Sequence, residues 1–354
     1  MIVKSNFTPA WWLKNRHVQT IFPAFFRRRP KLSVRRERIE FPDGDFADCD
    51  WTGGDSGPIV IVLHGLEGSI DSAYAAGIMA MIERCGWRGA LLHFRGCSGE
   101  PNRLATGYHS GFTADLDFLV KRIRSREPNT PLAAIGFSLG GNVLLKWLGE
   151  GGDSAPLATA IAVSAPFDPA AAADTVERGL SRIYNWYLLR SMRRSTECKF
   201  RRMKAPLPLP KLASLKTFRQ FDDAVTAPLH GFSDAADYYH RNGSRRFLRA
   251  IEVPTLLLQS ADDPVVGAEA IPNENELAPS VTLEISNRGG HVGFVSGRWP
   301  WRARYWLEDR IRLHLLRYLG EANVRPMKAA THRPRPQSPA TSPAGSQGNS
   351  ATGK

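Results

Sequence analysis

Three short, continuously apolar segments place the strongest constraint on what this chain can fold into. They lie at residues 58–63, 89–94 and 131–137, and helical patterns at 72–85 and 113–125 separate them. Apolar runs without alternation are typical of strands that are buried on both faces of a parallel sheet. The alternation of strands and helices therefore predicts a doubly wound α/β sheet.

Further strand candidates extend this sheet on both sides. Apolar runs at 157–164, 255–260 and 281–286 follow the three central segments, and two shorter candidates at 35–41 and 47–51 precede them. The sequence thus predicts a mostly parallel sheet of about eight strands, flanked by helices.

The remaining segments differ in character from the sheet. Residues 1–34 are aromatic and basic, and we expect an N-terminal arm that packs on a main domain at 35–321. Residues 166–250 are mainly helical, Arg-rich and aromatic. An insertion after the fourth parallel strand would lie above the carboxyl ends of the strands, so we expect a helical lid there. Residues 322–354 lack periodicity and predict a disordered basic tail.

The net charge of +13 is concentrated in three segments. Residues 14–38, 182–204 and 322–354 carry excesses of 8, 7 and 5 positive charges, which leaves −7 for the rest of the chain. Because no nucleic-acid recognition motif accompanies the charge, we expect solvated basic segments or weak attraction to an anionic membrane surface, and no nucleic-acid binding.

Cysteine use and hydrophobicity bear on the compartment. The four cysteines lie far apart without a C-x-x-C pair, no apolar run reaches the length of a membrane span, and the N-terminus lacks an apolar signal-peptide stretch. We expect a cytoplasmic protein, and a peripheral position on the inner membrane surface stays open.

A glycine-rich segment follows the apolar run at 131–137. It reads GFSLGG at 136–141 and continues into an apolar helical segment. The pattern G-x-S-x-G between a strand and a helix is typical of the nucleophile turn of the α/β-hydrolase fold, in which the serine hydroxyl stands clear of the sheet. We therefore predict that Ser138 is the nucleophile of an acyl-transfer reaction.

In this fold the acid and the base follow the serine along the chain. Asp263 comes after the run at 255–260, and we expect its neighbour Asp262 to be a turn residue. His291 lies in a glycine-rich loop after the last strand candidate. Such a loop can place the imidazole between the Ser138 hydroxyl and the Asp263 carboxylate, so these three residues are the predicted catalytic triad.

The first central strand runs into a possible oxyanion hole. The segment His64-Gly65-Leu66 follows residues 58–63, and Leu139 directly follows the nucleophile. We predict that the backbone N–H groups of Leu66 and Leu139 bind the oxyanion. No ligand cluster surrounds His64, so we expect no metal site, and acyl transfer by these groups needs no cofactor.

Several longer motifs resemble the YheT-like branch of the α/β-hydrolase superfamily. They are NRHVQTIFP at 15–23, LHGLEGS at 63–69, FRGCSGEPN at 94–102, YHSG at 108–111, GFSLGGN at 136–142, FDD at 221–223, DYY at 237–239 and DDP at 262–264. That branch includes bacterial esterases and eukaryotic membrane-associated lipases and phospholipases. The resemblance implies the triad Ser138, Asp263 and His291, and hydrolysis of carboxylic esters with short-to-medium or lipid acyl chains.

Three other functions stay open at this point. An acyltransferase would use the same triad with an alcohol in place of water. A lipase or phospholipase would act at a lipid surface, which the aromatic and basic segments allow. A non-catalytic binding module fits less well, because the predicted catalytic elements are complete. The expected partner is a small-molecule or lipid ester, and the sequence does not define the oligomeric state.

Overall fold

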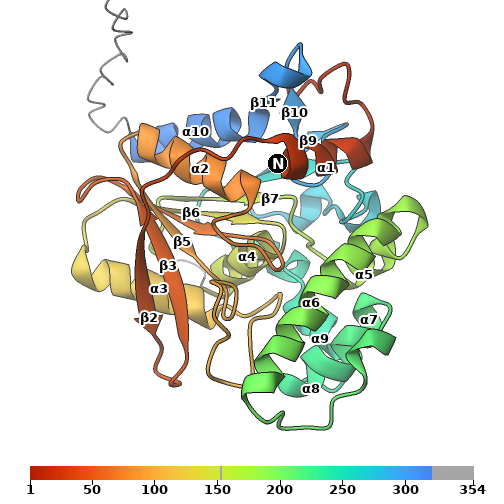
Figure 1. The fold of residues 1–354 in the computed structure, drawn as a ribbon. Coiled ribbons are helices and arrows are strands. Elements are labelled where there is room, and N and C mark those ends of the chain that lie inside the picture. Colours follow the sequence, from red (N-terminus) through yellow and green to blue (C-terminus); the bar gives the residue numbers. More distant parts are fainter. Residues whose placement is uncertain (152–153, 321–354) are drawn as a thin grey trace, which may run out of the picture. The chain divides into compact units, whose positions relative to one another are not determined.

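A nine-stranded sheet forms the centre of the fold in the computed structural model, which describes residues 1–151 and 154–320 (Figure 1). The order is β1-β9-β8-β7-β6-β4-β5-β3-β2. In this order, each pair of neighbours from β1 to β5 is parallel. β3 pairs antiparallel with β5, and β2 pairs antiparallel with β3. The strands are Ile2–Lys4 (β1), Arg35–Glu40 (β2), Phe46–Thr52 (β3), Ile59–Leu63 (β4), Arg88–Leu92 (β5), Leu132–Phe137 (β6), Thr159–Val163 (β7), Thr255–Ser260 (β8) and Val281–Ser286 (β9). The tail predicted to be disordered, at 322–354, lies outside the described residues.

The ninth strand is the one that the sequence did not predict. β1 belongs to the N-terminal arm and pairs in parallel with β9, with Ile2 opposite Leu283. Ser5 N continues the pairing by donating to Ile285 O at 2.8 Å. A strand of three residues has too little periodicity to stand out in a sequence, because its conformation depends on the edge that it pairs with.

Helices cover both faces of the sheet (Figure 1). Ile61 of β4 packs in an apolar cluster with side chains of α3 and α4, whereas its neighbour Val62 packs in a second cluster with side chains of α2 and α10. Successive side chains of a strand point to opposite faces, so this sheet is buried on both. The helices are Arg16–Phe26 (α1), Ala73–Arg84 (α2), Ala114–Arg126 (α3), Leu139–Gly151 (α4), Pro169–Val176 (α5), Arg182–Arg202 (α6), Phe218–Phe221 (α7), Ala227–Leu229 (α8), Ala235–Asn242 (α9) and Trp306–Leu319 (α10).

The chain between β7 and β8 contains α5 to α9, which lie together at one side of the sheet (Figure 1). α6 is the longest of them and contributes Leu189 to an apolar cluster with Leu212 and Phe221. Among the described residues, no helix combines the length and the hydrophobicity that crossing a lipid bilayer requires. A two-stranded ribbon of Val295–Ser296 (β10) and Arg304–Tyr305 (β11) precedes α10.

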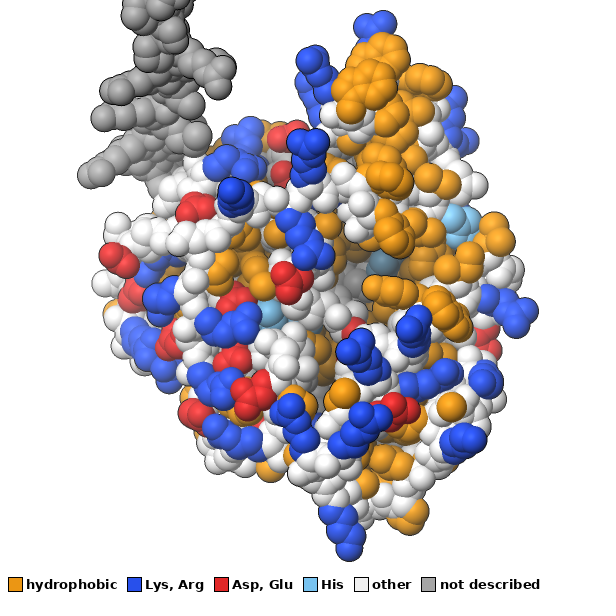
Figure 2. Space-filling model, viewed as in Figure 1, with side chains coloured by type: hydrophobic (Ala, Val, Ile, Leu, Met, Phe, Trp, Pro, Cys, Tyr) orange, Lys and Arg blue, Asp and Glu red, His pale blue; other side chains and the backbone are white. Residues whose placement is uncertain are grey.

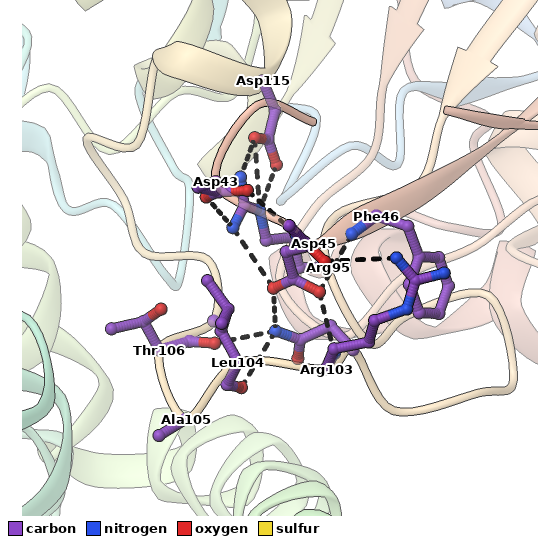
Figure 3. Close-up of polar contacts among 12 residues, drawn as sticks. Asp43, Asp45, Phe46, Arg95, Arg103, Leu104, Ala105, Thr106 and Asp115 are labelled. Atoms are coloured by element: carbon purple, nitrogen blue, oxygen red, sulfur yellow. Dashed lines mark hydrogen bonds and ion pairs between the residues drawn. The ribbon is translucent and has the colours of Figure 1, made fainter. Parts of the chain in front are cut away.

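A buried ionic network holds the loop after β5 (Figure 3). The Arg95 guanidinium donates to Asp115 at 2.7 and 2.9 Å, to Asp43 at 2.7 Å and to Asp45 at 3.2 Å. Burial raises the pKa of the Asp115 carboxyl, and the Arg95 guanidinium opposes this rise. Asp45 also accepts from the Asn102 side chain. The network therefore joins the β2–β3 turn, the loop after β5 and the start of α3.

We expect Arg95→Met to lower the free energy of unfolding by about 3–5 kcal/mol, because it leaves buried carboxylates without a cation. Urea unfolding measures this loss. Arg103→Met is the matched control, since Arg103 pairs with Glu40 at the surface, where solvent screens the ion pair and its loss should change stability little. Equal losses in the two variants would contradict this account of the network.

Candidate active site

Ser138 lies at the sharp turn between β6 and α4. Its backbone is in the left-handed region, with φ at 51°, a conformation that is strained for any residue except glycine. A Cβ at Gly136 would lie 2.3 Å from the Gly140 carbonyl oxygen, and a Cβ at Gly140 would lie 2.5 Å from the His64 carbonyl oxygen. Glycine at these two positions therefore lets strand, helix and oxyanion loop approach closely enough to maintain the turn.

The structure brings the three predicted triad residues into one hydrogen-bonded chain. Ser138 Oγ lies 2.9 Å from His291 Nε2, and His291 Nδ1 lies 2.9 Å from Asp263 Oδ2. The Asp263 side chain is fully buried, whereas 14% of the His291 side chain is exposed. In this arrangement the imidazole can accept the serine proton while the carboxylate fixes its tautomer and orientation.

The two neighbouring aspartates make different contacts. Asp263 Oδ1 accepts from the N–H groups of Val265 (2.8 Å) and Val266 (3.0 Å), so its carboxylate is held by its own loop. Asp262, expected as a turn residue, accepts from Gly290 N at 3.0 Å. It thereby connects the loop after β8 to the backbone directly before His291.

Two residues of α1, which sequence reasoning did not single out as site residues, also hold the His291 loop. The buried Gln19 side chain donates to Val295 O (2.9 Å) and accepts from Val295 N (2.7 Å). Thr20 Oγ1 accepts from His291 N at 2.9 Å. Both residues belong to the NRHVQTIFP motif at 15–23, which was the signal in the sequence that could have identified them as site residues. The motif places the first helix of the chain against the loop that carries the base.

The predicted oxyanion donors belong to the loop after β4 and to the start of α4. The loop after β4 passes close to the serine, because a Cβ at Gly65 would lie 3.3 Å from Ser138 Cβ. Leu139 is the first residue of α4, where backbone N–H groups have no partner within the helix. Within the described residues, neither Leu66 N nor Leu139 N donates a hydrogen bond to another residue. Both groups are therefore free to bind an anion.

His64 shapes this oxyanion loop from within. Its Nδ1 donates to Gly65 O at 2.7 Å, and its Nε2 accepts from Phe94 N at 3.0 Å. Burial lowers the pKa of His64 to about 3, so the ring is neutral, as this pair of hydrogen bonds requires. Both ring nitrogens are thus occupied by the backbone. The Tyr74 hydroxyl accepts from Gly65 N at 2.7 Å and supports the same loop.

Known proteins resemble this chain over most of its length. Residues 58–298 match the family model described as alpha/beta hydrolase fold. The chain is 40% identical to the Escherichia coli (strain K12) protein named "Putative esterase YheT", over 89% of this chain and 94% of that protein. It is 29% identical to "Phospholipase ABHD3" of Bos taurus, over 88% of this chain and 78% of that protein.

A solved structure shares the fold. The Pyrococcus furiosus esterase Pf2001 superposes with a TM-score of 0.54 at 16% sequence identity, over 82% of this chain and 92% of that one. At this identity the likeness concerns the fold alone.

We expect Thr20→Val to slow the labelling of Ser138 by a fluorophosphonate about tenfold to 100-fold. The variant leaves His291 N without its acceptor, and a shift of about 1 Å at a catalytic group can cost 100-fold in rate. Thr20→Ser keeps the hydroxyl and should label at the rate of the wild type. Equal labelling of the valine variant would show that this contact does not position His291.

Proposed function

The chain belongs to the alpha/beta hydrolase fold family, and we propose that it is a serine carboxylic-ester hydrolase. Ser138 is the nucleophile, His291 is the general base, and Asp263 orients the imidazole. The observation that carries this proposal is the chain of two 2.9 Å hydrogen bonds through His291, because a serine becomes nucleophilic only with a base in reach.

The proposed reaction has two acyl-transfer steps. Ser138 Oγ attacks the ester carbonyl while His291 Nε2 takes its proton. The N–H groups of Leu66 and Leu139 stabilise the tetrahedral oxyanion, and the alcohol leaves with the proton from His291. A water molecule, deprotonated by His291, then hydrolyses the acyl-enzyme and releases the carboxylic acid. Besides the ester and water, each step uses side-chain and backbone groups of this chain, without a cofactor.

The proposed substrates are esters of short-to-medium or lipid acyl chains. The relatives named esterase and phospholipase support an ester as the substrate. An acyltransferase would use the same site, with an alcohol attacking the acyl-enzyme in place of water. Product analysis with added alcohol separates the two reactions, and a panel of esters of graded chain length defines the acyl preference.

We expect Ser138→Ala to abolish both fluorophosphonate labelling and ester hydrolysis, because no other nucleophile occupies its position in the proposed mechanism. Labelling is followed on a gel, and hydrolysis is followed with the ester panel. Labelling that survives the substitution would refute the assignment of Ser138.

The two aspartates provide a matched pair for the same prediction. Asp263→Asn should lower kcat by about 10⁴, since the imidazole loses the carboxylate that sets its tautomer. Asp262→Asn keeps an oxygen that can accept from Gly290 N, so it should lower kcat far less. The reverse order of effects would identify Asp262 as the orienting acid.

One surface favours a second candidate function, lipid hydrolysis at a membrane. Large hydrophobic side chains are exposed on three segments, and hydrophobic side chains extend from the β10–β11 ribbon toward α6 on the face shown in Figure 2. We call these residues the aromatic surface; they are Trp11, Phe25, Phe26, Leu180, Ile183, Trp186, Tyr187, Trp299 and Trp301. The Trp186 and Tyr187 side chains are 59% and 65% exposed, so they do not form the buried roof of an acyl pocket.

The charges around the aromatic surface fit an anionic lipid layer. Residues 1–36, 178–196 and 287–307, which supply all of its side chains, contain no Asp or Glu and many Lys and Arg. Aromatic rings enter the headgroup region of a bilayer, and each nearby cation contributes on the order of 1 kcal/mol at an anionic surface. The surface also adjoins the site, because α1 carries both Phe25 and Thr20. We propose that the enzyme docks peripherally on anionic membranes.

We expect the Ser138→Ala protein to co-sediment with anionic phospholipid vesicles, to bind neutral vesicles little, and to be released by salt. A further Trp186→Ser or Trp301→Ser substitution should weaken binding several-fold. Leu313→Ser is the control, because Leu313 is 57% exposed on α10 outside this surface. Protein that stays in the supernatant with anionic vesicles at low salt would refute membrane docking and leave the esterase proposal intact.

A further inference from the structure

Glu67 follows Leu66 in the oxyanion loop, and its backbone is in the left-handed region with φ at 55°. Glycine stands at positions 65 and 68 of the same loop, yet this position carries a side chain despite the strain that the conformation imposes. Such strain persists where the surrounding contacts maintain it, often at functional sites. The contacts of the Glu67 carboxylate therefore identify what maintains it.

Three neutral hydroxyl groups donate to this carboxylate. Tyr108 donates to Oε1 at 2.9 Å, and the same Tyr108 oxygen accepts from Glu67 N at 2.9 Å. Ser191 and Ser195 donate to Oε2 at 3.0 and 2.5 Å. The two serines lie one turn apart on α6, so they face the oxyanion loop together. Glu67 thus connects α6 directly to the oxyanion loop, at the position after Leu66.

α6 also makes contacts near the site at both of its ends. Directly before the helix, Ser181 Oγ donates to Pro264 O at 2.7 Å, and within its first turn the Tyr184 hydroxyl lies 3.2 Å from His17 Nδ1 of α1. In its last turn, Lys199 Nζ donates to the carbonyl oxygens of Ala105 and Thr106. Those two residues belong to the loop that the Arg95 network holds (Figure 3).

The contacts of α6 differ in kind on its two sides. Toward the segment between α6 and α8 it packs through apolar side chains, with Leu189 completely buried, and the Asn185 and Arg193 side chains add hydrogen bonds to backbone carbonyl groups there. Toward the catalytic residues, the contacts given above are hydrogen bonds of single side chains. Those bonds can break without exposing the two apolar clusters that cover the faces of the sheet.

We propose that Glu67 is a latch between α6 and the oxyanion hole. With α6 across the site, Ser191 and Ser195 hold the carboxylate, and the carboxylate holds the loop so that Leu66 N points toward Ser138. When α6 moves away to admit an ester, the same bonds are lost and the oxyanion donor is no longer fixed. The enzyme therefore completes its catalytic site only after it has closed over the substrate. This inference rests on the proposed function, and Glu67 is a positioning residue in it.

Glu67→Gly removes the carboxylate and suits the left-handed backbone, so the variant should fold with an unchanged Tm. We expect kcat to fall at least tenfold with KM changed less than threefold, because the loss concerns the transition state. The double variant Ser191→Ala/Ser195→Ala should lose the same factor without any change in the oxyanion loop. Combining all three substitutions should cause no further loss, since they interrupt one connection.

Thr196→Ala is the matched control, because the Thr196 hydroxyl donates to Met192 O within the same helix. It should keep the kcat of the wild type. A double serine variant with the kcat of the wild type would overturn the latch, whatever the effect of Glu67→Gly. An unchanged kcat in Glu67→Gly would overturn it as well.

Amide hydrogen exchange separates a failure of the latch from a failure of the proposed function. If the wild type hydrolyses no ester, the esterase proposal is wrong, and exchange still tests the contact. Amides of α6 should exchange at least threefold faster in Glu67→Gly than in Thr196→Ala. Equal exchange rates in the two variants would overturn the latch.

Discussion

The close crossing of β6 and α4 is the constraint on which the rest of the site depends. Gly136 and Gly140 have no room for a Cβ, and their contact holds Ser138 in a left-handed backbone conformation at the end of a central strand. The base and the oxyanion loop must lie next to Ser138, and the acid must lie next to the base. They do so from loops at the carboxyl ends of neighbouring parallel strands, where an α/β sheet gathers its loops.

Two sets of supports, one on each side of Ser138, hold those loops. On the side of the base, Gln19 and Thr20 contact the His291 loop. On the side of the oxyanion, the Arg95 network holds the loop that leads to Tyr108, and Tyr108 contacts Glu67. Stability and site geometry are therefore coupled. The buried charges of this network contact no reacting atom, but they hold in place the loops whose groups do contact the reacting atoms. Such support is typical of preorganised sites.

Local patterns in the sequence predict the sheet and the positions of Ser138, Asp263 and His291, because each depends on a strand and the few residues after it. The structure brings these three together at hydrogen-bond distance. Thr20 and Glu67 lie in two of the longer motifs, but local strand and helix patterns did not assign them a role, since their contacts join positions 271 and 124 residues apart. β1 was missed for the same reason: its conformation comes from pairing with β9. Such contacts leave no periodic signal in the chain.

The pairing of the first residues with the last strand has a consequence for synthesis. A ribosome makes β1 and α1 long before it makes two of their partners, β9 and the loop that carries His291, which follow more than 260 residues later. The turn at Ser138 can form long before that, because its strand and helix are adjacent in the chain. During this interval β1 lacks the strand that it pairs with and Thr20 lacks the loop that it holds, whereas Trp12 and Phe22 can already contact each other. Contacts of such sequence separation form late and slowly, so the supports of the catalytic base are completed only after β9 and the His291 loop have been made.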